Sequence, residues 1–161
     1  MFTVRSMRKE DLGIVAQLNK ECFPEDNSTL TDAREWIEAN WKAAPRTSYF
    51  VLIDEEGQVE GYILWLEKGG FRKEAVLELE QIAVIPSQRG RGGGRTLIQQ
   101  TLPQLKERLA LQGRTIKLIE VTTAADNEAQ RLYRDTLGAE VEATIHDLFR
   151  GNEVIMVARN L

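Results

Sequence analysis

A glycine-rich stretch between an apolar strand and a long amphipathic helix constrains the fold of this chain more than any other feature. Four glycines and three arginines fall within residues 89–95. An apolar run precedes them over 82–85, and apolar residues at helical spacing follow over 97–109. Glycines in this context let backbone N–H groups converge on an anion without Cβ obstruction, and the helix start adds partial positive charge. The stretch therefore predicts a pyrophosphate-binding loop.

Hydrophobic patterning over the rest of the chain predicts a mixed α/β fold. Alternating, aromatic or β-branched runs predict strands over residues 2–7, 48–53, 59–66, 75–85, 116–121, 140–146 and 153–158. Apolar stripes predict a first helix capped by Asp11, a second over 31–41, the long helix that stops at Gly113, and a fourth over 127–137. We expect one domain over residues 1–161, with a central mixed sheet of about seven strands flanked by helices.

The first two helices carry apolar stripes that predict their buried faces. The stripe of the first helix consists of Ile14, Val15, Leu18 and Cys22. The stripe of the second helix consists of Ala33, Trp36, Ile37 and Trp41.

The strand over 75–85 changes its pattern part-way along. Leucines alternate with glutamates over 77–80, so one face is apolar and the other acidic, whereas from Ile82 onward both faces are apolar. Two explanations remain open. Either the strand enters the centre of the sheet there, or it shifts parity at a bulge near Glu80–Gln81.

The amino-acid composition limits the kinds of site and function that we expect. The 25 acidic residues outnumber the 21 Lys and Arg, which disfavours a nucleic-acid binder. Cys22 is the only cysteine and His146 the only histidine, so we expect no disulfide, no metal site and no histidine-based triad. The sequence shows no signal-peptide core and no run of about 20 apolar residues, so we expect a cytoplasmic protein without a membrane partner.

Spacing excludes two common phosphate-binding loops. A Walker A loop would need glycine at position 89 and lysine at position 95, and both positions hold arginine. A dinucleotide-binding G-x-G-x-x-G motif that starts at Gly90 would need glycine at position 95 as well.

Two segments instead resemble motifs of the GNAT superfamily of N-acetyltransferases. Arg89-x-x-Gly92-x-Gly94, after Ala83-Val84-Ile85-Pro86, is similar to the acyl-CoA loop of that family, which reads Arg/Gln-x-x-Gly-x-Gly/Ala. Residues 126–139 are similar to its second motif, Asn-x-x-Ala-x-x-x-Tyr followed by Leu-Gly-Phe. Here Asp126 holds the asparagine position, Asn127 comes one residue late, and Ala139 replaces Phe. The resemblance covers nearly the whole chain, because the order of elements also matches.

The resemblance implies that the chain transfers the acetyl group of acetyl-CoA to a primary amine by direct attack. It implies that backbone groups of Ile82, Ala83 and Val84 contact the pantetheine arm. It further implies that the loop takes the pyrophosphate through Arg89, Gly90, Arg91, Gly92, Gly93, Gly94 and Arg95. Asn127 either bonds the pantetheine or caps the helix. The acceptor is a small-molecule amine, or a protein N-terminus or lysine; no signature for it appears in 23–47 or 146–154, where the family sets specificity.

Three residues are candidates for proton transfer. By resemblance Tyr133 is the general acid, since a phenol with pKa near 10 is protonated at neutral pH; periodicity alone would make it a core tyrosine. Glu80 or Glu120 could accept the ammonium proton through a water, and the proton could also leave through ordered water alone.

Two other functions stay open. The same fold could serve as a non-catalytic acyl-CoA-binding regulatory module, which would need no proton donor at Tyr133. Arg89, Arg91 and Arg95 could bind nucleic acid, although the acidic balance opposes it. The final hairpin offers an edge strand that could pair in a homodimer.

Overall fold

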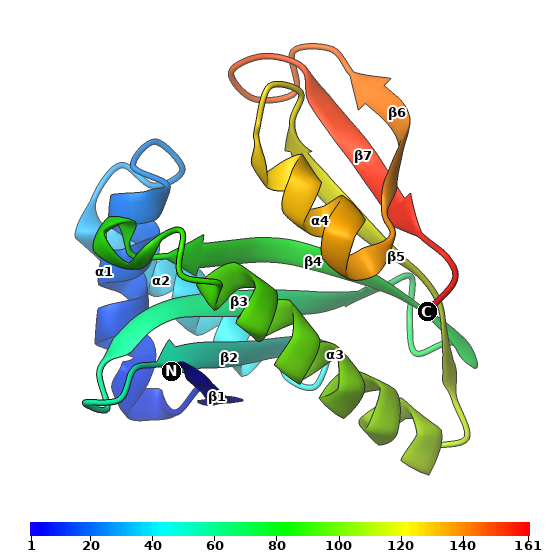
Figure 1. Cartoon of the computed structure of the whole chain (residues 1–161), viewed down its shortest axis with the longest axis horizontal. Coiled ribbons are helices and arrows are strands. Elements are labelled where there is room, and N and C mark those ends of the chain that lie inside the picture. Colours follow the sequence, from blue (N-terminus) through cyan, green and yellow to red (C-terminus); the bar gives the residue numbers. More distant parts are fainter. The chain divides into compact units, whose positions relative to one another are not determined.

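The computed structural model describes residues 1–161 and contains a mixed sheet with strand order β1-β2-β3-β4-β5-β7-β6 (Figure 1). The strands are β1 (Thr3–Ser6), β2 (Thr47–Ile53), β3 (Val59–Lys68), β4 (Glu74–Val84), β5 (Thr115–Ala124), β6 (Glu140–Ile145) and β7 (Glu153–Ala158). The helices are α1 (Leu12–Cys22), α2 (Leu30–Lys42), α3 (Gly93–Leu111) and α4 (Ala129–Leu137). The predicted fold class and order of elements are confirmed. None of these helices is long and apolar enough to cross a membrane.

The chain forms two compact units. The first contains Met1–Trp65 and Gln81–Thr101, and the second contains Leu66–Glu80 and Leu102–Leu161. Three elements, β3, β4 and α3, run from one unit into the other. A single domain over the whole chain stays a prediction.

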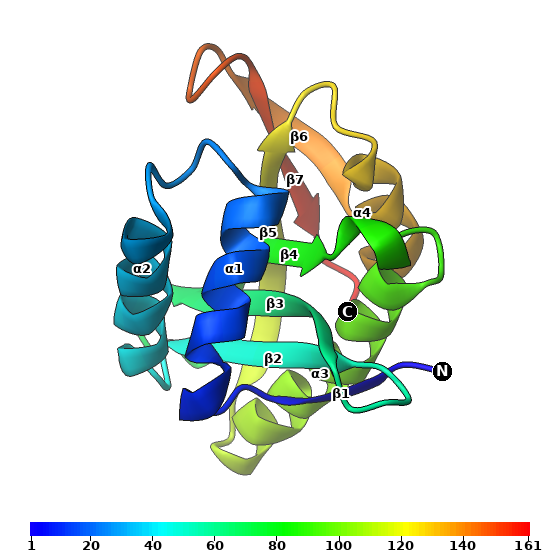
Figure 2. The same cartoon turned by 90° about the vertical axis from the view of Figure 1, so that its left-hand side faces the viewer.

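In the first unit, α1 and α2 pack on one face of β2 and β3 (Figure 2). Val15 and Leu18 of α1 and Ile37 of α2 are buried there, as predicted. The predicted inward positions of Ile14 and Trp36 are wrong, because these side chains are 36% and 44% exposed. Both residues lie at the margin of their stripes, and sequence periodicity does not define how far around the helix the sheet reaches.

The opposite face of the first unit is covered by the beginning of α3. Leu97 and Ile98 are buried, and Trp65 of β3 donates from Nε1 to Thr101 Oγ1 at 2.9 Å. The predicted apolar stripe of this long helix is therefore confirmed in this half, and Leu102, Leu105 and Leu109 are buried in the other unit.

In the second unit, β5 pairs in parallel with β4 and antiparallel with β7, which pairs antiparallel with β6. Val121 of β5 lies opposite Met156 of β7, and both are buried. α4 packs beside β5 and ends, as predicted, at Gly138, whose φ of 68° is a conformation that glycine adopts without strain (Figure 1).

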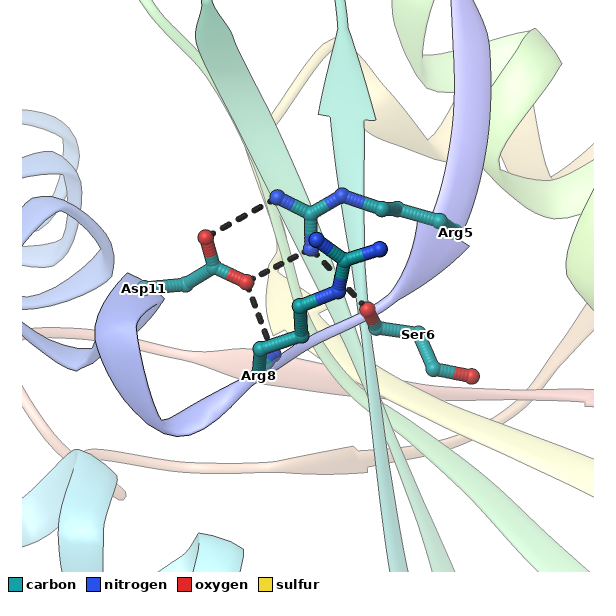
Figure 3. Close-up of polar contacts among 4 residues, drawn as sticks. All are labelled: Arg5, Ser6, Arg8 and Asp11. Atoms are coloured by element: carbon teal, nitrogen blue, oxygen red, sulfur yellow. Dashed lines mark hydrogen bonds and ion pairs between the residues drawn. The ribbon is translucent and has the colours of Figure 1, made fainter.

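The prediction that the Asp11 side chain caps α1 is wrong. Asp11 makes no side-chain bond to the helix; Arg5 of β1 instead donates to its carboxylate from Nη1 (2.7 Å) and Nη2 (3.0 Å) (Figure 3). The Arg8 backbone N–H donates to the same carboxylate at 2.7 Å. The bond from Arg5, more than any other contact, lowers the pKa of Asp11. The carboxylate thus ties the strand β1 to the segment that leads into α1.

We expect Asp11→Ala to lower the free energy of unfolding by about 2 kcal/mol at neutral pH, because it removes a mostly buried carboxylate with three donors. Since the pKa of Asp11 is lowered in the folded state, this stabilisation is complete above the unfolded pKa, about 3.9, and is lost as the pH falls through the folded pKa. Urea unfolding at several pH values measures it. Exposed Lys9→Ala is the control, and equal stability of the Asp11 variant and the parent at neutral pH would contradict the assignment.

Candidate active site

The glycine loop follows β4 directly. A short 3-10 turn covers Pro86–Gln88, and α3 begins at Gly93. Between them Gly90 and Gly92 have φ angles of 78° and 83°. Any other residue would be strained in this left-handed conformation, so the glycine spacing is a requirement of the backbone path.

Backbone N–H groups of the loop are available to an anion. Arg89 N donates to Pro86 O at 3.3 Å, and Thr96 N donates to Gly92 O at 2.9 Å. Between these two bonds, the N–H groups of Gly90 through Gly94 make no hydrogen bond within the chain. The loop therefore presents consecutive donors at the positive end of α3.

Gly93 permits the close approach of α3 to the sheet. A Cβ atom at this position would lie 2.8 Å from Leu52 Cδ2 of β2. A side chain at position 93 would therefore have to displace Leu52, and glycine lets the start of the helix lie close to β2.

The arginines of the loop also make contacts within the chain. Arg89 donates from Nε to Val84 O at 3.0 Å. Burial raises the pKa of the Cys22 thiol, and the hydrogen bond and charge of Arg89 oppose that rise. Arg91 donates to Gln88 Oε1 and lies 5.7 Å from the ring centroid of Phe2. Both side chains therefore help to shape the loop, and their predicted contact with a pyrophosphate stays a prediction, as does that of Arg95.

The end of β4 has an edge that β5 does not cover. The parallel pairing of these strands ends with Glu78 opposite Glu120, although β4 continues to Val84. Backbone groups along Leu79–Val84 that point away from β3 consequently have no strand partner in this pairing.

Alternation along β4 shows which backbone groups face that edge. Ile85 N donates to Glu60 O of β3 at 2.8 Å, and Ala83 O lies next to Gly61 of β3. Because successive residues of a strand turn their backbone groups to opposite sides, Ile82 and Val84 face away from β3. Of the three residues predicted to meet the pantetheine arm, Ala83 is thus turned toward β3.

Contacts with β3 fit the predicted bulge in β4. Tyr62 and Lys68 lie on the same face of β3, since their positions in the strand differ by an even number of residues. Lys68 Nζ pairs with Glu78 at 3.5 Å, whereas Tyr62 donates from its hydroxyl to Gln81 Oε1 at 2.9 Å. In a regular strand Glu78 and Gln81 would point to opposite faces, so β4 shifts parity between them.

The structure gives the two glutamate candidates different surroundings. Glu120 lies 2.6 Å from Lys68 Nζ, and this hydrogen bond is the largest cause of the raised pKa of Lys68. Its carboxylate is therefore held by a cation. Glu80 is half-buried within the stretch of β4 that shifts parity. Both belong to the second unit, as does Tyr133, whereas the glycine loop belongs to the first.

Tyr133 lies on the inner stripe of α4 and is only 5% exposed. Burial raises its pKa to about 12, and its hydroxyl makes no hydrogen bond within the chain. The phenol is therefore protonated at physiological pH and has a donor to offer.

Asn127 uses both side-chain polar atoms within the chain. Its Oδ1 accepts from Ala129 N at 2.9 Å, at the start of α4, and its Nδ2 donates to Thr123 Oγ1 at 3.0 Å. These bonds favour the helix-start role, and contact with the pantetheine stays a prediction.

Sequence reasoning missed a buried polar cluster in the first unit. Asn19 of α1, Tyr62 of β3 and Gln81 of β4 are joined by hydrogen bonds, and Asn19 and Tyr62 are fully buried. One signal was present. Asn19 occupies an inward position on the stripe between Val15 and Cys22, and a buried asparagine needs partners.

A match to a family model shows which family the chain belongs to. The model of the acetyltransferase (GNAT) family matches residues 13–139, which include the glycine loop and Tyr133. The chain belongs to the GNAT family of acetyltransferases. Among curated proteins, none matches the sequence.

Solved GNAT structures share the fold at low sequence identity. A GNAT-family protein from Desulfovibrio desulfuricans is 18% identical, with a TM-score of 0.74 and 99% of each chain covered. The N152L mutant of spermidine N-acetyltransferase SpeG from Vibrio cholerae is 20% identical, with a TM-score of 0.75 over 98% of this chain and 93% of that one. The ribosomal-protein-S18-alanine N-acetyltransferase from Escherichia coli is 21% identical, with a TM-score of 0.72 over 99% and 94%.

Proposed function

We propose that this GNAT protein is an N-acetyltransferase that moves the acetyl group of acetyl-CoA to a primary amine by direct attack. The observation that carries the proposal is the run of unbonded N–H groups from Gly90 through Gly94, in the loop that the family match includes. These groups suit the diphosphate of coenzyme A. The backbone groups of Ile82 and the N–H of Val84, which face away from β3, suit the amides of the pantetheine arm, whereas Val84 O already accepts from Arg89 Nε at 3.0 Å.

The reaction removes protons from the amine nitrogen, returns one to the departing sulfur, and needs no further reactant. The amine nitrogen attacks the thioester carbon, and the carbon–sulfur bond then breaks to give the amide and a thiolate. The amine must be neutral to attack, so a water-linked carboxylate first takes the proton of its ammonium form, and the N–H proton released on amide formation leaves by the same route. The departing thiolate takes up a proton from solvent at a pH below its pKa. Tyr133 donates a hydrogen bond to the developing thiolate, which its neutral phenol can do throughout the physiological range.

Thiol release from acetyl-CoA with a panel of amines tests this function directly. We expect amine-dependent release of coenzyme A together with the acetylated amine. The alternative is an acyl-CoA-binding regulatory module, for which coenzyme A would raise the melting temperature but no amine would give turnover. The structural neighbours are named for a polyamine and for a protein alanine, so the panel includes oligoamines, lysine derivatives and peptides with free N-termini.

The base is distinguished by two matched variants. We expect Glu80→Gln to lower kcat/KM for the amine about tenfold or more at pH 7, with partial recovery at pH 9 because more of the amine is already deprotonated. Glu120→Gln should change turnover only a few-fold, because Lys68 already holds that carboxylate. Steady-state kinetics of both variants across this pH range provide the test. Equal turnover of the Glu80 variant and the parent would assign proton removal to water or to Glu120.

Three finer points belong to the same proposal. Acetyl is the proposed donor group in preference to a longer acyl chain, and competition between acetyl-CoA and longer acyl-CoA esters measures the choice. A cytoplasmic location and a homodimer paired through the final hairpin also remain proposals. Sedimentation at several protein concentrations tests the dimer.

A further inference from the structure

The polar cluster around Gln81 holds one side of its carboxamide and leaves the other side open. Gln81 Oε1 accepts from the Tyr62 hydroxyl at 2.9 Å and from Asn19 Nδ2 at 3.3 Å. Asn19 Nδ2 also donates to the Tyr62 hydroxyl at 3.0 Å, and Asn27 Nδ2 donates to Asn19 Oδ1 at 2.9 Å. Gln81 Nε2 has no partner in the chain, and the residue is only partly buried.

This arrangement gives Gln81 a fixed direction. Two donors hold Oε1, so Nε2 projects away from Asn19 and Tyr62 with two N–H bonds to offer. Asn19 and Tyr62 are themselves fully buried and come from α1 and β3, which makes the support rigid. An oriented amide of this kind costs little entropy when it binds a ligand oxygen.

The position of Gln81 is as specific as its direction. It comes directly before Ile82, the first of the two residues whose backbone groups turn to the edge that β5 leaves uncovered. A thioester that lies along this edge would react close to Gln81.

We infer that Gln81 selects the acceptor, and that the acceptor is an amine with a carbonyl oxygen a few bonds from the nitrogen, as at a peptide N-terminus. An N–H donor binds such an oxygen and offers nothing to a second ammonium group, so an oligoamine would be a poorer acceptor. The inference rests on the proposed acetyl transfer and deepens it by naming the substrate class.

The first test compares a tripeptide that has a free N-terminus with 1,5-diaminopentane at saturating acetyl-CoA. Gln81→Glu keeps an oxygen to accept from Tyr62 and Asn19, but it replaces the two donors by a charged acceptor. We expect the ratio of kcat/KM for the tripeptide to that for the diamine to fall at least tenfold in this variant. The affinity for coenzyme A should stay within twofold. An unchanged ratio overturns the inference while acetyl transfer itself stands.

A second test depends less on the charge of the variant. It uses the same tripeptide and an analogue in which a trans carbon–carbon double bond replaces the first peptide bond, so that the carbonyl oxygen is lost and no second ammonium group is added. The preference for the carbonyl form, measured as the ratio of the two kcat/KM values, should be about tenfold larger in the parent than in Gln81→Met, because only the parent has the amide donors. Equal preference in both proteins overturns the inference. Absence of turnover with every amine overturns the proposed function, and this inference with it.

Discussion

Replacing Tyr133 with phenylalanine is expected to lower kcat about a hundredfold, while the affinity for acetyl-CoA stays within twofold. A loss of kcat of this size is typical when one hydrogen-bond donor to a developing anion is removed. Burial raises the pKa of Tyr133 to about 12, whereas a thiol has a pKa of about 8.5. Complete proton transfer would therefore be uphill by about 5 kcal/mol. We expect the phenol to stabilise the thiolate mainly as a donor.

The raised pKa of Tyr133 also predicts the pH dependence of this effect. Tyr133 stays protonated well above pH 9, so the ratio of parent to variant kcat should be constant between about pH 6 and pH 9. The free energy of unfolding should change by less than about 1 kcal/mol, because the hydroxyl has no partner in the chain. A kcat within twofold of the parent would contradict the role of Tyr133 and favour the core tyrosine that periodicity suggests.

Acetyl-pantetheine, which lacks the diphosphate and nucleotide, is expected to react with kcat/KM about a thousandfold below that of acetyl-CoA. Two charge-assisted bonds from the loop amides, at about 2 kcal/mol each, account for a factor of this size. Steady-state kinetics with one amine and the two thioesters measure it. Because both carry the same thioester and pantetheine arm, the chemical step is matched.

Gly92→Ala is the control for the loop. Its φ of 83° would strain an alanine by about 1–2 kcal/mol, so the loop backbone should move. We expect the preference for acetyl-CoA over acetyl-pantetheine to shrink about tenfold in this variant, with acetyl-pantetheine turnover little changed. Equal losses with both thioesters would show that the loop supports the fold and does not contact the diphosphate.

Local features of the fold could be predicted because their causes are local. The strand, glycine loop and helix over 82–109 depend on backbone conformations and periodicity that neighbouring residues determine. The faces of Ile14 and Trp36 could not be predicted, because the reach of the sheet beside a helix depends on distant strands. The partner of Asp11 could not be predicted for the same reason, because Arg5 of β1, and not the N–H groups of the helix, donates to its carboxylate.

In the site, too, local features could be predicted and contacts between distant residues could not. The available amides follow from the glycine spacing, but the direction of backbone groups at Ala83 depends on its pairing with β3. The capture of Glu120 by Lys68 joins residues far apart in the chain, as do the bonds between Asn19, Tyr62 and Gln81. Contacts of such length have no short-range signature in a single sequence.

A crystal structure with bound coenzyme A tests the central claim most directly. We expect diphosphate oxygens within about 3.2 Å of backbone nitrogens in Gly90–Gly94, and the pantetheine arm along the edge that Ile82 and Val84 face. A coenzyme bound elsewhere on the chain, or a loop whose amides turn away from the diphosphate, would contradict the proposed function.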